Sequence, residues 1–368
     1  DVLNAATVVL TTYGMVSIRP HEDRERPQWV SPLWNIEWER IIYDEAHHLR
    51  NSTSNQHKGA LCLGANKPIQ WFVTGTPINN NLNDLYALMH LSGISIKDYL
   101  NPLKLEKILE TYMLRRTKKS VGIVLPKCIE EKIPVHYDDA NEEELSRSVH
   151  AMLSLSNVSA KNVNTCVRYL ADCPLPLLLR AKQCCILPNL VKNALETRIP
   201  DGVEMGRIGK VDTSAKLKSV ISKIEENKDS GKAKLVFCHF RQEIDDLEKA
   251  LEKDFTVEKI DGRTSKRERN NILTVRDPDV LLIQIKTGCE GLNLQQYSEI
   301  YFTSPHWNPA VEDQAVCRAH RMGQKDDVHV YKFITNFAEK FAVTLDEYCA
   351  GIQDNKRDLQ QQYIKLTK

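Results

Sequence analysis

Residues 40–49 read RIIYDEAHHL, and this stretch decides the fold class. Three apolar residues, Ile41–Tyr43, end a short strand that runs directly into the acidic pair Asp44 and Glu45. Continuous apolar strands are typical of parallel sheets that are buried on both faces. Ligands of such sheets bind at the carboxyl ends of the strands, which is where this pair lies. We therefore predict an α/β protein with a functional site at that edge.

The same strand pattern recurs along the chain in two clusters, at about 1–135 and 205–340, separated by helix-forming sequence. We expect a hinge at 198–212, where Pro and Gly are frequent, and a helical tail over 338–368. The predicted strands are Thr7–Thr11, Arg40–Tyr43, Gln70–Val73, Ala233–Cys238, Thr256–Ile260, Val280–Gln284, Glu299–Phe302 and His329–Phe333. The predicted helices are Asn83–Leu91, Ser214–Asn227, Arg241–Lys253 and Ala310–Arg318.

The acidic pair suits nucleotide chemistry. Asp44 can hold Mg²⁺, an ion that prefers oxygen ligands and carries nucleotide phosphates. Glu45 can orient and deprotonate an attacking water. His47 would sense the nucleotide or link this turn to the next motif. The alternative is an acidic surface turn after a strand.

A second strand runs into Thr74-Gly75-Thr76-Pro77. We expect its two hydroxyls to face the same sheet edge as Asp44, in a loop that responds to phosphate chemistry. Taken alone, the segment is better interpreted as a simple Gly-Pro turn with a threonine cap.

The third motif combines IKTGCEGLNL (285–294) with HWNPAVEDQAVCRAHRMGQ (306–324). Lys286, Thr287 and Gly288 leave a strand in what we interpret as a phosphate-gripping loop. Gln314, Arg318 and Arg321 are spaced i, i+4, i+7, which predicts one shared helical face. Two arginines there can stabilise a γ-phosphate, a role worth roughly 10³–10⁵ in rate. A solvated basic helix face is the alternative.

Composition sets broad limits. The 368 residues carry 50 basic and 49 acidic side chains, so a histone-like basic protein is excluded, although a local basic groove is not. No apolar run reaches 18 residues, and no membrane association is expected. The ten cysteines form no Cys-x-x-Cys pair, which favours reduced thiols in the cytosol or nucleus. Cys166, Cys173, Cys184 and Cys185 are the candidates for a zinc site, which we do not expect.

In this order, the motifs resemble the motor of SNF2-type ATPases, which are superfamily 2 DNA translocases. The similarity to the Rad5/Rad16-like subgroup includes LLLRAKQCCILP (177–188). The matching segments are TTYGMV (11–16), DEAH (44–47), TGTP (74–77), LNDLYALMHL (82–91), YMLRRTKKSV (112–121), LVFCHF (235–240), KIDGRTSKRER (259–269), KTGCEGLNL (286–294), WNPAVEDQA (307–315) and RAHRMGQ (318–324).

The resemblance implies two RecA-like parallel-sheet lobes, the first incomplete. Residues 1–135 would be the C-terminal part of lobe 1 and 136–205 a helical insertion or linker. Residues 206–340 would be lobe 2, and 341–368 a helical tail. The cofactors would be ATP and Mg²⁺, the partner double-stranded DNA, and the location nuclear. Nucleosomes or other DNA-bound proteins are further candidate partners.

The resemblance also assigns roles to individual residues. Asp44 and Glu45 would be the Walker B pair, and Gln314, Arg318 and Arg321 would complete the ATP site across a cleft between lobes. Gly291 and Asn293 would lie near the nucleotide. The residues that would line the DNA track are Thr12, Arg263, Lys286, Thr287, Gly288 and Trp307.

This sequence also departs from the family pattern. Leu187 stands where the subgroup has His, Cys289 and Glu290 replace a small Gly-rich pair, and no RING-finger spacing occurs. The family's G-x-x-x-x-G-K-[ST] phosphate loop is absent from these 368 residues. We expect the chain to be a piece of a DNA-translocating ATPase that does not hydrolyse ATP alone. The alternative is an inactive remnant that only binds DNA or protein.

Overall fold

The computed structural model describes residues 2–18, 31–66, 68–78, 82–116, 118–153, 175–191, 214–288, 291–337 and 343–365. The chain divides into two compact units, each considered by itself below. The first comprises Asp1–Arg116 with Asp358–Lys368, and the second comprises Thr117–Arg357. None of the described helices is long and apolar enough to cross a membrane.

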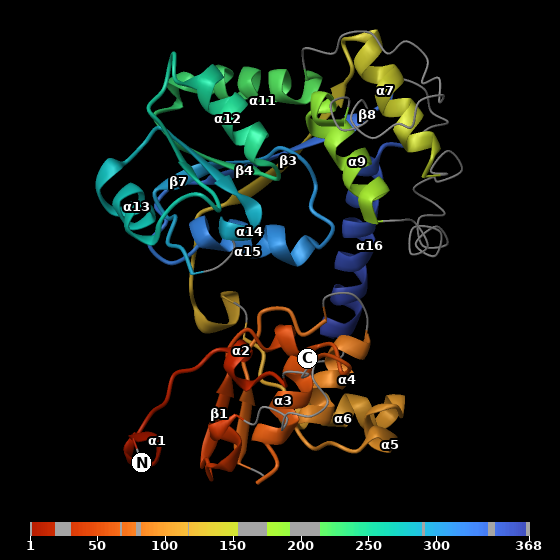
Figure 1. Cartoon of the computed structure of the whole chain (residues 1–368), viewed down its shortest axis with the longest axis vertical. Helices are drawn as coiled ribbons and strands as arrows, with labels where there is room; N and C mark the ends of the chain where they lie inside the picture. Colours follow the sequence, from red (N-terminus) through yellow and green to blue (C-terminus); the bar gives the residue numbers. More distant parts are fainter. Residues whose placement is uncertain are drawn as a thin grey trace, which may run out of the picture. The chain divides into compact units, whose positions relative to one another are not determined.

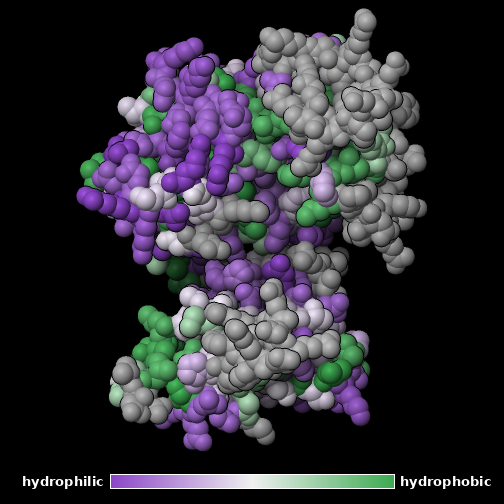
Figure 2. Space-filling model, viewed as in Figure 1, coloured by the Kyte–Doolittle hydropathy of each residue, from purple (hydrophilic) through white to green (hydrophobic). Residues whose placement is uncertain are grey.

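The first unit contains a parallel pair of strands, β1 (Arg40–Tyr43) and β2 (Ile69–Phe72). One face of the pair packs on helices through Ile41 and Tyr43, which contact apolar residues of α3 and α4. The other face leaves Ile42 and Trp71 largely exposed, and apolar surface is visible on this unit in Figure 2. The helices of the unit are α1 (Val2–Ala5), α2 (Tyr13–Val16), α3 (Asn55–Leu63), α4 (Leu82–Leu91), α5 (Ile96–Tyr99) and α6 (Pro102–Tyr112).

The strand predicted at Thr7–Thr11 does not form, and this part of the chain is irregular. Val8 and Leu10 are 75% and 93% exposed. A β-forming sequence becomes a strand only when a neighbouring strand accepts its backbone hydrogen bonds, and the described residues place none beside it.

The second unit is built on a parallel sheet of six strands in the order β3-β8-β7-β4-β6-β5. Hydrophilic residues cover its α11 and α12 side in Figure 2. The strands are β3 (Cys128–His136), β4 (Ala233–Cys238), β5 (Val257–Ile260), β6 (Val280–Gln284), β7 (Tyr297–Phe302) and β8 (Val328–Asn336). The helices are α7 (Ala140–Ala151), α9 (Leu175–Ile186), α11 (Ala215–Glu226), α12 (Arg241–Leu251), α13 (Lys266–Asn271), α14 (Ile285–Gly288), α15 (Pro309–Ala319) and α16 (Leu345–Lys365).

Residues of the central strands β4, β6, β7 and β8 contribute to two separate cores, one on each face of this sheet. Helices lie on both faces in Figure 1. Phe237 and Phe302 pack with α15 on one face, whereas Val236 and Tyr301 pack on the other. The second core also takes in residues of α7, α9, α11, α12 and α16. The α/β class predicted from the strand pattern is therefore confirmed.

The border between the units differs from the expected one at residue 135. Strand β3 pairs along its whole length with β8, so it belongs to the second sheet. No strand is predicted here, and the segment contains the charged residues Glu130, Glu131 and Lys132 as well as Pro134. An edge strand tolerates charge and proline because one of its sides needs no partner. The expected hinge at 198–212 lies outside the described residues.

Candidate functional site

The DEAH turn follows β1 and is held in a tight left-handed conformation. Glu45 has φ 47° and ψ 48°, a region that non-glycine residues seldom occupy. Its backbone N–H donates to the Asp44 carboxylate over 3.0 Å. Ala46 and Leu49, which begin and end a short 3-10 helix, are fully buried and fasten the turn to the core. Both carboxylates therefore lie at the carboxyl edge of the sheet, with Asp44 exposed.

The TGTP loop after β2 is hydrogen-bonded to this turn. The Val73 N–H donates to the Tyr43 carbonyl over 2.9 Å, and the Ala46 N–H donates to the Val73 carbonyl over 2.9 Å. The His47 Nδ1 atom lies 3.2 Å from Thr74 Oγ1 and 3.2 Å from Glu45 Oε2. The Thr74 hydroxyl thus lies near Glu45 at this edge, with His47 between them. The response of the loop to phosphate chemistry stays a prediction.

The protonation state of His47 determines what this link can transmit. Burial, followed by the nearby His48 and Arg50, lowers the pKa of His47 to about 4. The ring is therefore neutral at pH 7 and carries one N–H proton. If this proton is on Nδ1, it can be donated to Glu45 or to Thr74. Glu45 and Thr74 are then alternative acceptors for this one proton.

The segment that contains Thr12 reaches the same turn through Tyr13. The Tyr13 hydroxyl donates to the Asp44 carbonyl over 2.6 Å. Burial, Asp44 and Glu45 raise the pKa of Tyr13, so the hydroxyl keeps its proton. Thr12 itself is exposed at the start of α2 and makes no side-chain cap bond. Sequence reasoning named Thr12 and overlooked Tyr13, although a tyrosine beside a candidate DNA contact was a visible signal.

In the second unit, the predicted DNA-track residues gather at one edge of the sheet. Arg263 follows β5, Thr287 follows β6 and Trp307 follows β7. Strands β7, β4, β6 and β5 are successive neighbours, so their carboxyl ends lie side by side. Residues 285–288 form the short helix α14 where the sequence predicts a phosphate-gripping loop. The side chain of Lys286 lies outside the described part of the chain.

Arg263 is already engaged within the protein. Its guanidinium makes a two-pronged contact with Asp245 at 2.8 and 2.9 Å. Its Nε also donates to the buried Asp261 carboxylate over 3.0 Å. The Arg263 hydrogen bond lowers the pKa of Asp245 to about 2. Arg263 therefore holds its own loop in shape, and a phosphate would compete with two carboxylates for it.

Gln314 and Arg318 lie on α15 and are half-buried. Arg321 does not share their helical face, because α15 ends at Ala319 and Arg321 lies in the following turn. That turn is stabilised by Gln324, whose amide donates to the carbonyls of Gln295 and Tyr297. The predicted i, i+4, i+7 stripe is therefore wrong at its last position, because the chain leaves the helix first.

The loop that carries Gly291 and Asn293 packs against this end of α15. The Leu294 N–H donates to the Arg318 carbonyl over 3.1 Å, and Gln295 Nε2 donates to the Met322 carbonyl over 2.7 Å. Gly291 has φ 69°, which suits glycine. Asn293 is exposed between two buried leucines. The structure thus brings Asn293 and the arginine segment together within the second unit.

The candidate nucleotide residues are divided between the two units. Asp44 and Glu45 belong to the first unit, whereas Gln314, Arg318 and Arg321 belong to the second. Leu187 is buried in the core of the second unit. Cys289, Glu290, Cys166 and Cys173 lie outside the described residues. Within the described ranges, no three His, Cys, Asp or Glu side chains are placed to hold a metal ion.

Comparison with known proteins agrees with the order of these motifs. Residues 1–101 match the SNF2-related domain, and residues 215–323 match the helicase conserved C-terminal domain. A putative ATP-dependent helicase/translocase of Bacillus subtilis, YwqA, is 28% identical over 98% of this chain and 38% of its own length. DNA repair protein RAD5A of Arabidopsis thaliana is 26% identical over 96% of this chain and 46% of its own.

A solved structure, the C-terminal part of the Fun30 ATPase domain, aligns with a TM-score of 0.42 and 16% identity, covering 65% of this chain and 99% of that one. The chain spans about half or less of the length of these two curated relatives. Both family models match in the order that the motifs predict, and the relatives include helicases and a Rad5 protein. The chain belongs to the SNF2 family of helicase-like proteins.

Proposed function

We propose that residues 1–368 form a large part of a motor that uses ATP to move along double-stranded DNA. The observation that carries this proposal is the hydrogen-bonded junction of Glu45, His47 and Thr74 at the carboxyl edge of the first sheet. An acidic surface turn alone would not require a neutral histidine shared between a carboxylate and the next loop. The junction is suited to passing a change at the nucleotide into the rest of the unit.

The donor groups of the DEAH turn fit Mg²⁺ with a bound nucleotide. Asp44 offers exposed carboxylate oxygens, the ligand type that Mg²⁺ prefers. We assign Asp44 to that ion and Glu45 to orienting the attacking water. When bound, Mg²⁺ would neutralise charge that develops on the phosphates. Gly291, Asn293, Gln314, Arg318 and Arg321 are the proposed contributions of the second unit to the nucleotide.

The DNA track would consist of Thr12 in the first unit together with Lys286, Thr287, Gly288 and Trp307 in the second. Arg263 would support this track by shaping its loop, since its guanidinium is shared by Asp245 and Asp261. We propose duplex DNA as the partner, with nucleosomes or other DNA-bound proteins as its natural setting. We also propose a nuclear location, although one relative is bacterial.

Hydrolysis provides the first test. These 368 residues contain no G-x-x-x-x-G-K-[ST] loop, which normally binds the phosphates through backbone N–H groups and lysine. We therefore expect residues 1–368 to show no DNA-stimulated ATP hydrolysis. Turnover comparable to that of intact motors would contradict this expectation.

A longer chain that adds such a loop upstream tests the role of Glu45. Glu45→Gln should abolish hydrolysis there and leave nucleotide binding intact, because the amide cannot take a proton from water. Glu39→Gln, an exposed carboxylate close to the same strand, is the matched control and should hydrolyse normally. Unchanged turnover in Glu45→Gln would remove Glu45 from its assigned role.

DNA binding provides the second test, and it requires only residues 1–368. Affinity for duplexes of different sequence should be similar and should fall steeply with salt, because phosphate contacts release counterions. The absence of a phosphate loop from these 368 residues favours a second candidate function, a non-hydrolysing remnant that only binds DNA or another protein. A complex insensitive to salt, with no affinity for duplex DNA, would support the protein-binding form of that candidate instead.

A further inference from the structure

Residues 304–308 connect β7 to α15 and present Trp307, which is 37% exposed. Buried polar groups hold this segment from within. The Lys182 ammonium donates to the Pro305 carbonyl over 2.6 Å, and His239 Nε2 lies 2.9 Å from the Ser304 carbonyl. Two of the residues that precede Trp307 are therefore fixed by side chains from distant parts of the second unit.

The helix α16 supplies a further group beside Trp307 itself. Gln353 is 3% exposed, and its Nε2 donates to the His306 carbonyl and to Glu312 Oε1, each over 2.6 Å. The same Glu312 oxygen accepts the His306 N–H over 2.7 Å. Gln353, His306 and Glu312 thus form a closed triangle that joins α16 to the first turn of α15.

The backbone after Trp307 is restrained as well. Asn308 caps α15 by accepting the Ala310 N–H over 3.1 Å, and its own N–H donates to His306 Nδ1 over 3.1 Å. Trp307 therefore lies between two residues whose peptide groups are engaged on both sides. The restrained backbone fixes the direction in which the Trp307 side chain leaves the chain.

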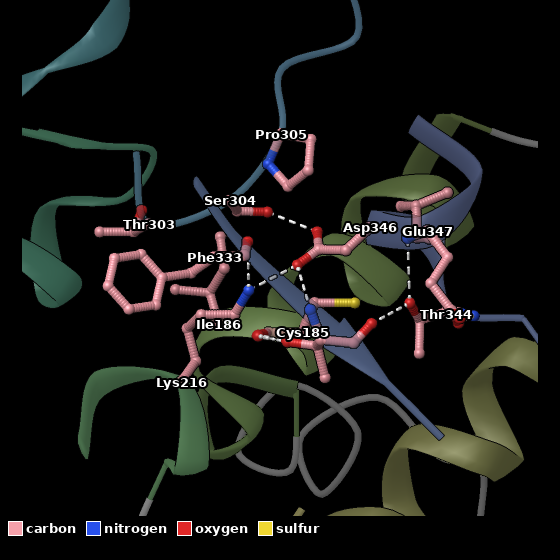
Figure 3. Close-up of polar contacts among 12 residues, drawn as sticks. Cys185, Ile186, Lys216, Thr303, Ser304, Pro305, Phe333, Thr344, Asp346 and Glu347 are labelled. Carbon is pink, nitrogen blue, oxygen red and sulfur yellow. Dashed lines mark hydrogen bonds and ion pairs between the residues drawn. The ribbon is translucent and has the colours of Figure 1, made fainter. Parts of the chain in front are cut away.

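The start of α16 is fastened by a buried charge cluster, shown in Figure 3. Asp346 is fully buried and contacts Lys216 at 2.7 Å, Lys182 at 3.1 Å and the Ser304 hydroxyl. Burial alone would raise the pKa of Asp346, but the two ammonium groups hold it well below its usual range. Buried charges are retained only when they are paired and hydrogen-bonded. These ion pairs therefore hold the start of α16 in one position on the second unit.

We propose that Gln353 is a positioning residue, which sets the direction of Trp307 and the start of α15 for contact with DNA. Its action is indirect, through the His306 backbone and Glu312. The DNA part of this inference rests on the proposed function. The positioning part does not, because it concerns the loop in the absence of any partner.

Fluorescence can test the positioning directly. The chain has five tryptophans, and Trp307 is the only one that belongs to the second unit. Its emission is obtained by subtracting the spectrum of the Trp307→Phe variant from that of the unaltered chain. Gln353→Leu removes the shared amide and leaves the His306 carbonyl and Glu312 short of a donor. We expect acrylamide to quench the Trp307 emission more strongly, and duplex DNA affinity to fall about tenfold, as for hydrogen bonds to a charged group.

Asp354→Asn is the matched control. Asp354 is the next residue on α16, but it pairs with Lys132 on β3 and does not reach the Trp307 loop. It should leave both the quenching and the DNA affinity unchanged. Gln353→Asn, whose shorter amide cannot reach both acceptors, is the milder variant if Gln353→Leu does not fold. Circular dichroism confirms that each variant is folded.

Unchanged Trp307 quenching in a folded Gln353 variant would overturn the proposal, as would an equal change in Asp354→Asn. If the unaltered chain does not bind duplex DNA, the proposed function fails, but increased quenching in Gln353→Leu still supports the positioning. If quenching increases and DNA affinity stays the same, positioning toward DNA is refuted.

Discussion

The two sheets of this protein use similar strands but bury them differently. In the second unit, the central strands β4, β6 and β7 carry residues that are almost wholly buried on both faces. In the first unit, β1 and β2 bury one face, while Ile42 and Trp71 on the other are 62% and 57% exposed. Parallel sheets are normally covered on both faces. The sheet of the second unit therefore has a core on each face, whereas the described sheet of the first unit has a core on one face only. A separate cluster among α4, α5 and α6 adds to the first unit.

This difference predicts that the two units respond unequally to comparable changes. Apolar burial contributes most of the stability of a domain, so substitutions in the second sheet should be costly. Substitutions on the open face of the first sheet should have little effect unless something covers it. Four experiments probe this contrast.

The largest effect is expected for Phe237→Ala in β4. Phe237 is 1% exposed and stacks on Phe302 with ring centroids 5.0 Å apart. Its removal leaves a cavity in a closed core and should lower the free energy of unfolding of the second unit by about 3–5 kcal/mol. Urea unfolding followed by segment-resolved hydrogen exchange measures this. A loss below about 1 kcal/mol would show that burial in the second sheet contributes no more stability than burial in the first.

Acid should weaken the second unit through His150. Burial lowers the pKa of this histidine to about 4, although the hydrogen bond between its Nδ1 and the Ser146 carbonyl, over 2.7 Å, acts in the opposite direction. Its Nε2 accepts the Leu345 N–H. The unfolded chain binds this proton near pH 6.5 and the folded unit only near pH 4. The contribution of His150 to stability should therefore be complete above about pH 6.5 and fall by on the order of 3 kcal/mol toward pH 4. Glu142 opposes this trend, because burial raises its pKa to about 7 and protonation of its carboxyl favours the folded unit.

Unfolding of the second unit measured at intervals from pH 4 to 7 checks this prediction. His150→Gln should flatten the profile, with part of the slope remaining because burial also lowers the pKa of His239. A His150→Gln variant with the same slope as the unaltered chain would assign the acid sensitivity elsewhere.

Gly59→Ala tests a close backbone contact between α3 and the end of α2 in the first unit. A β-carbon on Gly59 would lie 1.9 Å from the Val16 carbonyl oxygen, where α3 meets the end of α2. The backbone would have to shift, and we expect the first unit to lose about 1–3 kcal/mol. Gly93→Ala is an uncrowded comparison, although its φ of 77° adds strain of its own. Thermal melting followed by tryptophan emission reports on this unit.

The smallest effect is expected for Trp71→Thr on the open face of the first sheet. Threonine, like tryptophan, is favoured in strands, and the lost indole is mostly in water. Stability should change by no more than about 0.5 kcal/mol. A loss of several kcal/mol would mean that this face is covered in solution. The two sheets would then not differ in how many of their faces are buried.

Much of the fold was accessible from the sequence because apolar runs are local signals. Arg40–Tyr43, Ala233–Cys238 and Val280–Gln284 were each predicted with the bounds that the structure has. The errors share a cause. Thr7–Thr11 has strand-forming residues but no neighbouring strand among the residues that the structure describes. Cys128–His136 has charged residues but an edge position beside β8. Pairing partners are not written in a segment's own composition.

The site divides in the same way. The junction of the DEAH and TGTP loops was predictable, because parallel strands end at the same edge and their loops must meet there. The ion pair of Arg263 could not be predicted, because its partner Asp245 is 18 residues away on α12. The contacts of Gln353 could not be predicted either, since its hydrogen-bond acceptors lie more than 40 residues earlier in the chain.

By itself, the amino-acid sequence determined the α/β class, the edge that carries the site and the SNF2-type order of motifs, because strand periodicity and the carboxyl ends of strands follow from local pattern. Tertiary structure alone decided which polar side chains are already engaged and which stay available. Hydrogen bonds and charge pairs join segments that only folding brings together.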